Sequence, residues 1–237
     1  MAVLPLRLFR CATTCLALTV TIVLSRPAQA APAGTIAAPS LSHDPVLFVH
    51  GINESSLLWV TMINRLKQDG WTNAELFNWD YDYSASSEKT AGDIRDKVAE
   101  ILATTGAAKV DIISHSLGGV NSRWYLKFLD GVAKVDDWFS IAGANHGSTA
   151  AGLCSPLLVS CQEILPGSAF LTALNHGDET PGDVHYGTLR SDGDLFIRPT
   201  ESTVLEGAEN YKAGSPIGHI MLTQCEEVYP IIRDFVR

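Results

Sequence analysis

The stretch Ser114-His115-Ser116-Leu117-Gly118-Gly119 decides the fold that we expect for this sequence. An apolar run over 110–113 enters it and a helical pattern over 119–129 leaves it. Small residues two positions before and after a serine allow a turn so sharp that the serine hydroxyl stands clear of the sheet. This context predicts that Ser116 is a nucleophile, although Ser114 replaces the glycine of the usual pattern. The alternative is an ordinary strand-to-helix turn whose glycines serve packing.

Short apolar runs alternate with longer amphipathic segments on both sides of this stretch. The runs expected to form strands are 46–49, 74–78, 110–113, 138–142 and 184–189, with a last strand near Tyr211. Helices are expected over 57–67, 91–104, 119–129, 170–174 and 223–235. Such alternation predicts an α/β fold, a single domain with a mostly parallel central sheet and helices on both faces. The Gly- and Pro-rich stretch 143–183 breaks the rhythm, and we expect it to pass over the top of the sheet.

The first 30 residues have the layout of a secretory signal peptide. Arg7 and Arg10 form a positive start, an uncharged apolar run follows over 11–24, and Ala28-Gln29-Ala30 supplies a small-residue cleavage pattern. A membrane anchor is the alternative, but the run is shorter than the roughly 20 residues that a spanning helix needs. We therefore expect a secreted, extracellular protein without stable membrane insertion.

The composition indicates one folded domain. Of the 237 residues, 46% are hydrophobic and 18% charged, so the chain can bury a sizeable core. We expect a signal peptide over 1–30, a flexible lead-in over 31–44 and a catalytic domain over 45–237. The net charge is −9, and removing 1–30, which hold arginines but no acidic residue, makes it more negative. Such a chain is a poor candidate for binding nucleic acid, and we expect a monomer.

Three cysteines follow the predicted cleavage site. Cys154 and Cys161 enclose a short loop and are the natural disulfide pair, because export permits disulfides. Cys225 is then left over, and the alternative is three unpaired thiols. Cys-x-x-Cys and His-Cys clusters, which would indicate a metal, do not occur in the sequence. We therefore expect no metal.

The segment Val49-His50-Gly51-Ile52 ends the first expected strand. An oxyanion hole needs two backbone N–H groups aimed at one point, one after the nucleophile and one from the loop after an early strand. Leu117 supplies the first donor and Ile52 the second. The alternative is a plain turn in which His50 packs locally.

A serine hydroxyl needs a histidine base that a carboxylate orients. In the order serine, acid, histidine, His219 fits best, because it lies after the last expected strand and before the closing helix. His146 is the main rival, but it comes too early to follow the acid, and we assign it a role in shaping its loop. For the acid we favour Asp194, which opens an apolar run, over Asp192, which resembles a turn residue before glycine.

Taken together, these motifs resemble the class 2 bacterial lipases, which are similar to compact lidless bacterial lipases with a small residue in place of the first elbow glycine. The segments that carry the resemblance are 45–52, 114–119, 143–147, 177–182, Asp194 and 218–219. The resemblance implies a minimal α/β-hydrolase with a triad of Ser116, Asp194 and His219 and oxyanion donors Ile52 and Leu117. It implies a lipase or esterase that cleaves lipid or small-molecule esters through an acyl-enzyme, and this chemistry requires no cofactor.

Other functions remain open at this point. An acyltransferase or a polyester hydrolase could use the same triad, since fold and triad do not fix the acyl acceptor. A protein of another class, a non-catalytic binding protein, could share the scaffold. The apolar triplets 57–59 and 157–159 could line an acyl groove, but ordinary core packing explains them equally well.

Overall fold

The computed structural model describes residues 41–237, so the predicted signal peptide and most of the predicted lead-in lie outside the described residues. A six-stranded sheet has the order β2-β1-β3-β4-β5-β6, and every neighbouring pair is parallel. The strands are β1 (Val46–Val49), β2 (Leu76–Asn78), β3 (Val110–His115), β4 (Val135–Ile141), β5 (His185–Arg190) and β6 (Glu209–Lys212). This arrangement confirms the predicted parallel sheet.

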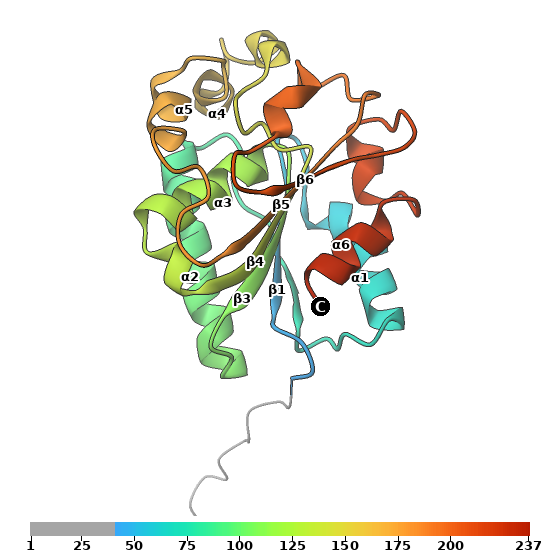
Figure 1. Cartoon of the computed structure of the whole chain (residues 1–237). Coiled ribbons are helices and arrows are strands. Elements are labelled where there is room, and N and C mark those ends of the chain that lie inside the picture. The colour runs from blue at the N-terminus through green and yellow to red at the C-terminus, as the bar shows by residue number, and fades with distance from the viewer. Residues whose placement is uncertain (1–40) are drawn as a thin grey trace, which may run out of the picture. The chain divides into compact units, whose positions relative to one another are not determined.

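Helices cover both faces of the sheet, as predicted (Figure 1). On one face lie α1 (Val60–Gln68) and α6 (Tyr229–Phe235), and on the other α2 (Ser87–Thr105) and α3 (Leu117–Phe128). The short helices α4 (Val159–Glu163) and α5 (Ala169–Leu174) belong to the stretch 143–183. Among the described residues, no helix combines the length and the apolar composition that crossing a membrane requires.

Strand β1 shows why the core has two sides. All four of its residues are fully buried. Leu47 and Val49 belong to the apolar cluster that holds the buried face of α2, whereas Val46 and Phe48 belong to the cluster that holds α1 and α6. A strand buried on both faces reads as a continuous apolar run, and the sequence therefore predicts its bounds correctly.

The helix starts differ from the predicted ones, most of all in α6 and α2. The closing helix was expected over 223–235, but α6 begins only at Tyr229, because Pro230 fits the first turn of a helix and not its interior. Helix α2 begins earlier than predicted, at Ser87. The hydroxyl of Ser86 caps it by accepting the N–H of Lys89 at 3.3 Å.

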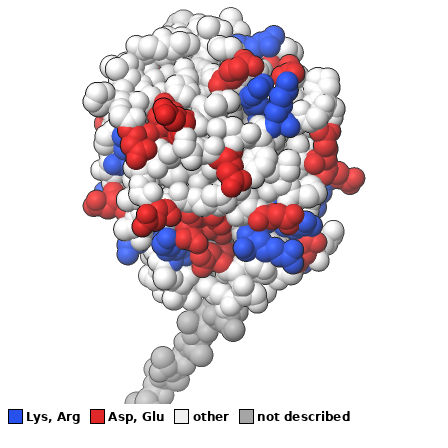
Figure 2. Space-filling view, viewed as in Figure 1, with Lys and Arg blue, Asp and Glu red and all other residues white. Residues whose placement is uncertain are grey.

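Charged side chains are interspersed on the face drawn in Figure 2, where Lys and Arg lie close to Asp and Glu. Several such pairs occur in the described part of the chain, for example Lys97 with Glu100 at 2.9 Å and Lys109 with Asp136 at 2.7 Å. On this face, basic residues therefore do not form the extended patch that nucleic acid would require.

Candidate active site

Ser116 sits at the sharp turn between β3 and α3. Its backbone has φ 54° and ψ −122°, a conformation that is strained for any residue with a side chain. Its N–H donates to the carbonyl of Ile141 at 3.0 Å, which fixes the turn to the neighbouring strand β4. The side chain is 7% exposed and lines a cavity at the carboxyl ends of the strands.

The small residues around Ser116 are required by close backbone contacts. A Cβ added to Gly118 would lie 2.4 Å from the carbonyl oxygen of Val49. Ser114, which takes the place of the usual first glycine, is fully buried, and its hydroxyl donates to the carbonyl of Phe139 at 3.2 Å. The serine is accommodated because β4 supplies an acceptor for its hydroxyl.

The loop after β1 lies directly against Ser116. A Cβ added to Gly51 would lie 2.7 Å from Cβ of Ser116, so only glycine permits this approach. Ile52 follows in this loop and lines the same cavity as Ser116, while Leu117 is the first residue of α3. The structure thus brings the segments of the two predicted oxyanion donors side by side. His50 packs locally, and its ring stacks on Tyr81 with centroids 4.1 Å apart.

His219 and Asp194 are hydrogen-bonded to each other. Nδ1 of His219 lies 2.7 Å from Oδ2 of Asp194, and both side chains are buried. The other carboxylate oxygen of Asp194 accepts the N–H groups of Phe196 at 2.8 Å and Ile197 at 3.0 Å. Asp192, by contrast, is exposed and pairs with Lys212 at 2.7 Å. The structure therefore brings Asp194 to His219, and not Asp192.

Burial and neighbouring charges set the ionisation of this pair. Burial alone would raise the pKa of Asp194, but the hydrogen bonds from His219 and from the two backbone amides hold this pKa below its usual value. Burial, and then the charge of His115, lower the pKa of His219 against the opposing effect of Asp194. A neutral imidazole beside an ionised carboxylate is the state that a general base requires.

The cavity beside Ser116 is largely apolar and has a volume of about 360 Å³. His219 also lines it, so Ser116 and His219 face the same space. Apolar lining residues include Ile52, Leu153, Ile164, Leu195, Phe196 and Ile220. The triplets 57–59 and 157–159 are not among the lining residues: Trp59 is buried in the core and Leu157 is exposed. The cavity can therefore hold an apolar group next to the hydroxyl of Ser116.

The predicted disulfide is present. Cys154 and Cys161 are joined with their Cα atoms 5.7 Å apart, and Cys154 lines the cavity. Cys225 is half-buried and forms no disulfide within the described residues. The cross-link thus closes a short loop in the wall of the cavity.

His146 joins two loops away from this cavity. Its Nε2 lies 2.7 Å from a carboxylate oxygen of Glu179, and its backbone N–H donates to the carbonyl of Ser202 at 2.9 Å. The first contact links the segment 143–147 to 177–182, and the second links it to the turn at 200–203. They agree with the loop-shaping role that the sequence suggests for His146.

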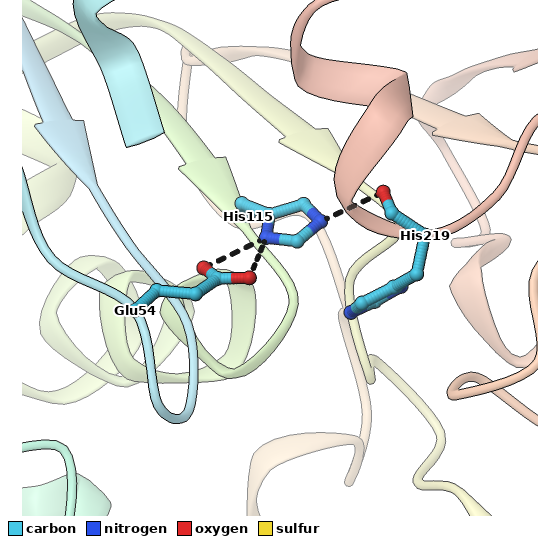
Figure 3. Close-up of side chains that lie close together, drawn as sticks. All are labelled: Glu54, His115 and His219. Atoms are coloured by element: carbon cyan, nitrogen blue, oxygen red, sulfur yellow. Dashed lines mark hydrogen bonds and ion pairs between the residues drawn. The ribbon is translucent and has the colours of Figure 1, made fainter. Parts of the chain in front are cut away.

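Two residues that the sequence does not single out, Glu54 and His115, lie beside His219 (Figure 3). Nδ1 of His115 is 2.9 Å from the Glu54 carboxylate, and Nε2 of His115 is 3.2 Å from the carbonyl oxygen of His219. In residues 41–237, only this trio places three or more potential metal-ligating groups within 4.8 Å of one another. His115 already pairs with Glu54 and with the backbone carbonyl of His219, while Nδ1 of His219 pairs with Asp194, so we interpret the trio as part of a hydrogen-bond network. A buried histidine inside a strand is the one signal that could have revealed it.

The chain is similar to known lipases in sequence and in structure. The profile of the family described as lipase (class 2) matches residues 43–224. The mature lipase BlEst2 of Bacillus licheniformis has a TM-score of 0.70 and 17% identity, over 84% of this chain and 94% of that chain. Lipase B of Aspergillus fumigatus has a TM-score of 0.65 and 19% identity, over 76% of this chain and 49% of that chain.

More distant enzymes share the same architecture. A pyrethroid hydrolase from Sphingobium faniae has a TM-score of 0.53 and 12% identity, over 81% of this chain and 97% of that chain. At these identities, the solved structures show a common α/β-hydrolase fold. The family profile covers most of the chain, including Ser116, Asp194 and His219. The chain therefore belongs to the class 2 lipase family, and that membership makes it a lipolytic hydrolase of carboxylic esters.

Proposed function

We propose that this chain is a lipase or esterase in which Ser116 is the nucleophile, His219 the general base and Asp194 the residue that orients the base. One observation carries the proposal. The strained Ser116 lines the same apolar cavity as His219, whose other ring nitrogen is bound to the buried carboxylate of Asp194. A nucleophile, a base and an orienting acid in this arrangement are what acyl transfer requires.

In the first step, Nε2 of His219 takes the proton of the Ser116 hydroxyl as its oxygen attacks the ester carbonyl carbon. The N–H groups of Ile52 and Leu117 stabilise the oxyanion that develops, and losing one such donor typically costs about 10²–10³ in turnover. Asp194 remains ionised, because its pKa is held low, and accepts the Nδ1–H of His219.

The tetrahedral intermediate then collapses. His219 gives its proton to the departing alcohol oxygen, and the acyl group stays on Ser116 as an ester. In the second step, His219 takes a proton from water, which attacks the acyl carbonyl. The acid is released and the proton returns to the Ser116 oxygen, so the enzyme is regenerated.

The cavity supports an ester with an apolar acyl group as the substrate. Leu153, Leu195 and Phe196 line the cavity and are 89%, 68% and 62% exposed. Large apolar side chains left exposed together mark a binding surface for an apolar ligand. A lipid or small-molecule ester fits this surface, whereas a charged acyl group does not.

We further propose that the protein is secreted and that the catalytic domain spans 45–237. The basic start, apolar run and Ala-x-Ala pattern of residues 1–30 support export. The disulfide between Cys154 and Cys161 is compatible with an oxidising compartment. Amino-terminal sequencing of protein from culture medium tests the cleavage site after Ala30. The monomeric state stays a prediction.

Hydrolysis of p-nitrophenyl esters across acyl lengths tests the proposed function. We expect activity in the wild type, its loss in Ser116→Ala, and its retention in Ser84→Ala, whose hydroxyl bonds only to Asp82 in an exposed turn. A fluorophosphonate probe should label Ser116. Well-folded wild type that is inactive on every ester would favour an acyltransferase or a non-catalytic binding protein instead.

A further inference from the structure

His115 and Glu54 form a buried pair that the proposed triad does not include. The side chain of His115 is fully buried and that of Glu54 is 7% exposed. Glu54 comes from the loop after β1, and His115 from the end of β3, one residue before Ser116. Since water has little access to either group, their protonation and their partners are set by the protein.

The hydrogen-bond partners of His115 favour an ion pair with Glu54. The two ring nitrogens of His115 face the carboxylate of Glu54 and the backbone carbonyl of His219, and both of these partners are acceptors. Both contacts are satisfied beside an ionised Glu54 when each nitrogen carries a proton, which is the imidazolium form of His115. Burial opposes the ionisation of Glu54, but His115 and the N–H of Gly51 hold the pKa of Glu54 below its usual value.

The pair connects the three segments that the proposed reaction uses. Glu54 accepts the N–H of Gly51 at 2.5 Å, which fixes the loop that carries Ile52. His115 is part of the turn that holds Ser116, and its Nε2 holds the carbonyl of His219. His115 and Glu54 thus connect the loop that carries Ile52, the turn that holds Ser116 and the loop that carries His219.

We propose that His115 and Glu54 are positioning residues, a buried ion pair that holds His219 and the amide of Ile52 in register with Ser116. The inference rests on the proposed function, since it assigns the pair a task in that reaction. A carboxylate or an imidazolium alone would be an unpaired buried charge, so the two residues are expected to act as a unit.

The same pair places charge next to the base. Three ionisable side chains face His219: Asp194 from the loop after β5, His115 from β3 and Glu54 from the loop after β1. The rings of His115 and His219 have centroids 4.5 Å apart. Burial, and to a smaller extent the charge of His115, lower the pKa of His50. A cation at this distance disfavours protonation of His219, and Glu54 offsets part of that effect.

Removing the cation should therefore move the pH profile. In His115→Asn, we expect kcat to fall by about 10- to 100-fold with little change in KM, because the base and the oxyanion donor lose their alignment. The acidic limb of the pH profile of kcat/KM should shift to higher pH by about one unit. The negative charge of Glu54 then favours protonation of His219 without the opposing positive charge of His115.

Glu54→Gln should lower kcat in the same way but should not move the acidic limb upward, because this variant removes the negative charge. The double variant should lose no more activity than either single variant, as expected for two residues that act together. His185→Asn is the matched control: His185 also pairs with carboxylates, Asp137 and Glu209, but is exposed at the start of β5. It should keep the wild-type profile.

A measurement on the unaltered protein keeps the test valid if a variant fails to fold. In protein labelled with ¹⁵N-histidine, the two ring nitrogens of His115 should both carry protons at pH 7, whereas those of His219 should have the neutral form. A neutral His115, an acidic limb that stays in place in His115→Asn, or an upward shift in Glu54→Gln would each overturn the proposal. Activity that survives Ser116→Ala would instead refute the proposed function and leave the nitrogen assignment as a separate result.

Discussion

Replacing Gly51 by alanine tests how closely the oxyanion loop approaches the nucleophile. The new Cβ would lie 2.7 Å from Cβ of Ser116 and 2.8 Å from Oε2 of Glu54, whereas ordinary contact begins at 3.4 Å. The loop or Ser116 must move by about 0.7 Å to relieve the overlap. A displacement of 1 Å in an active site can cost about 10²-fold, so we expect kcat/KM to fall by about 10- to 100-fold.

Stability should change much less than activity. Overpacking typically costs about 1–3 kcal/mol, and losing glycine restricts the unfolded chain, which returns about 0.4–1 kcal/mol. The free energy of unfolding of Gly51→Ala should thus drop by about 1 kcal/mol. The measurements are ester hydrolysis under kcat/KM conditions and urea unfolding.

Gly92→Ala is the matched control. Gly92 lies within α2, and an added Cβ there meets no atom within 4 Å. This variant should gain about 1 kcal/mol of stability from helix propensity and keep full activity. Folded Gly51→Ala with wild-type kcat/KM would show that the loop does not depend on contact with Ser116.

Three further changes test the site and the core. Asp194→Asn should lower kcat by about 10⁴-fold, as expected when the base loses its orienting carboxylate, while Asp192→Asn should have little effect; equal losses in ester hydrolysis would contradict the assignment. Because burial and His115 lower the pKa of His219, kcat/KM should rise with pH along a limb whose midpoint lies below the usual histidine pKa of 6.5; a midpoint above 6.5 in a pH–rate profile would contradict this. Burial, and then Asp137, raise the pKa of Asp111 well above its usual value, so an ionised Asp111 destabilises the folded protein. The contribution of this group to stability is fully present below the usual aspartate pKa and is lost as pH rises. Asp111→Asn removes this loss and should increase the free energy of unfolding at pH 7 by about 1 kcal/mol. Denaturant unfolding should show no such gain at a pH below the usual aspartate pKa.

The sequence predicts the centre of the sheet well and the helix ends poorly. Strand β1 is buried on both sides, so its composition alone marks it. The start of α2 depends on more than periodicity, because its first turn is polar and a carboxylate from a distant helix, Glu163, accepts the N–H of Ser87 at 2.6 Å. Local pattern cannot report such a contact, since the two residues meet only in the folded chain.

In the candidate site, too, local patterns predict some residues, whereas contacts between distant residues could not be predicted. The motif around Ser116 is enough to single it out, chain order singles out His219, and the apolar run after Asp194 separates it from Asp192. The pairing of Glu54 with His115 joins residues 61 positions apart. It depends on β1 and β3 being neighbours in the sheet, which fixes where the two strands end. Their roles in catalysis remain predictions for the experiments above.

The parallel sheet also decides where the protein can be attached to a solid support. All segments of the candidate site follow the carboxyl ends of strands. The amino ends of β1, β3 and β4 meet at the opposite end of the sheet, where the N–H of Asp111 bonds to the carbonyl of Pro45 and the N–H of Val110 to the carbonyl of Lys134. Lys109, in the turn before β3, is partly exposed there. A resin or an electrode coupled through this end of the sheet would leave the cavity open to bulk solution. Large or aggregated esters should therefore still reach the cavity of the immobilised enzyme.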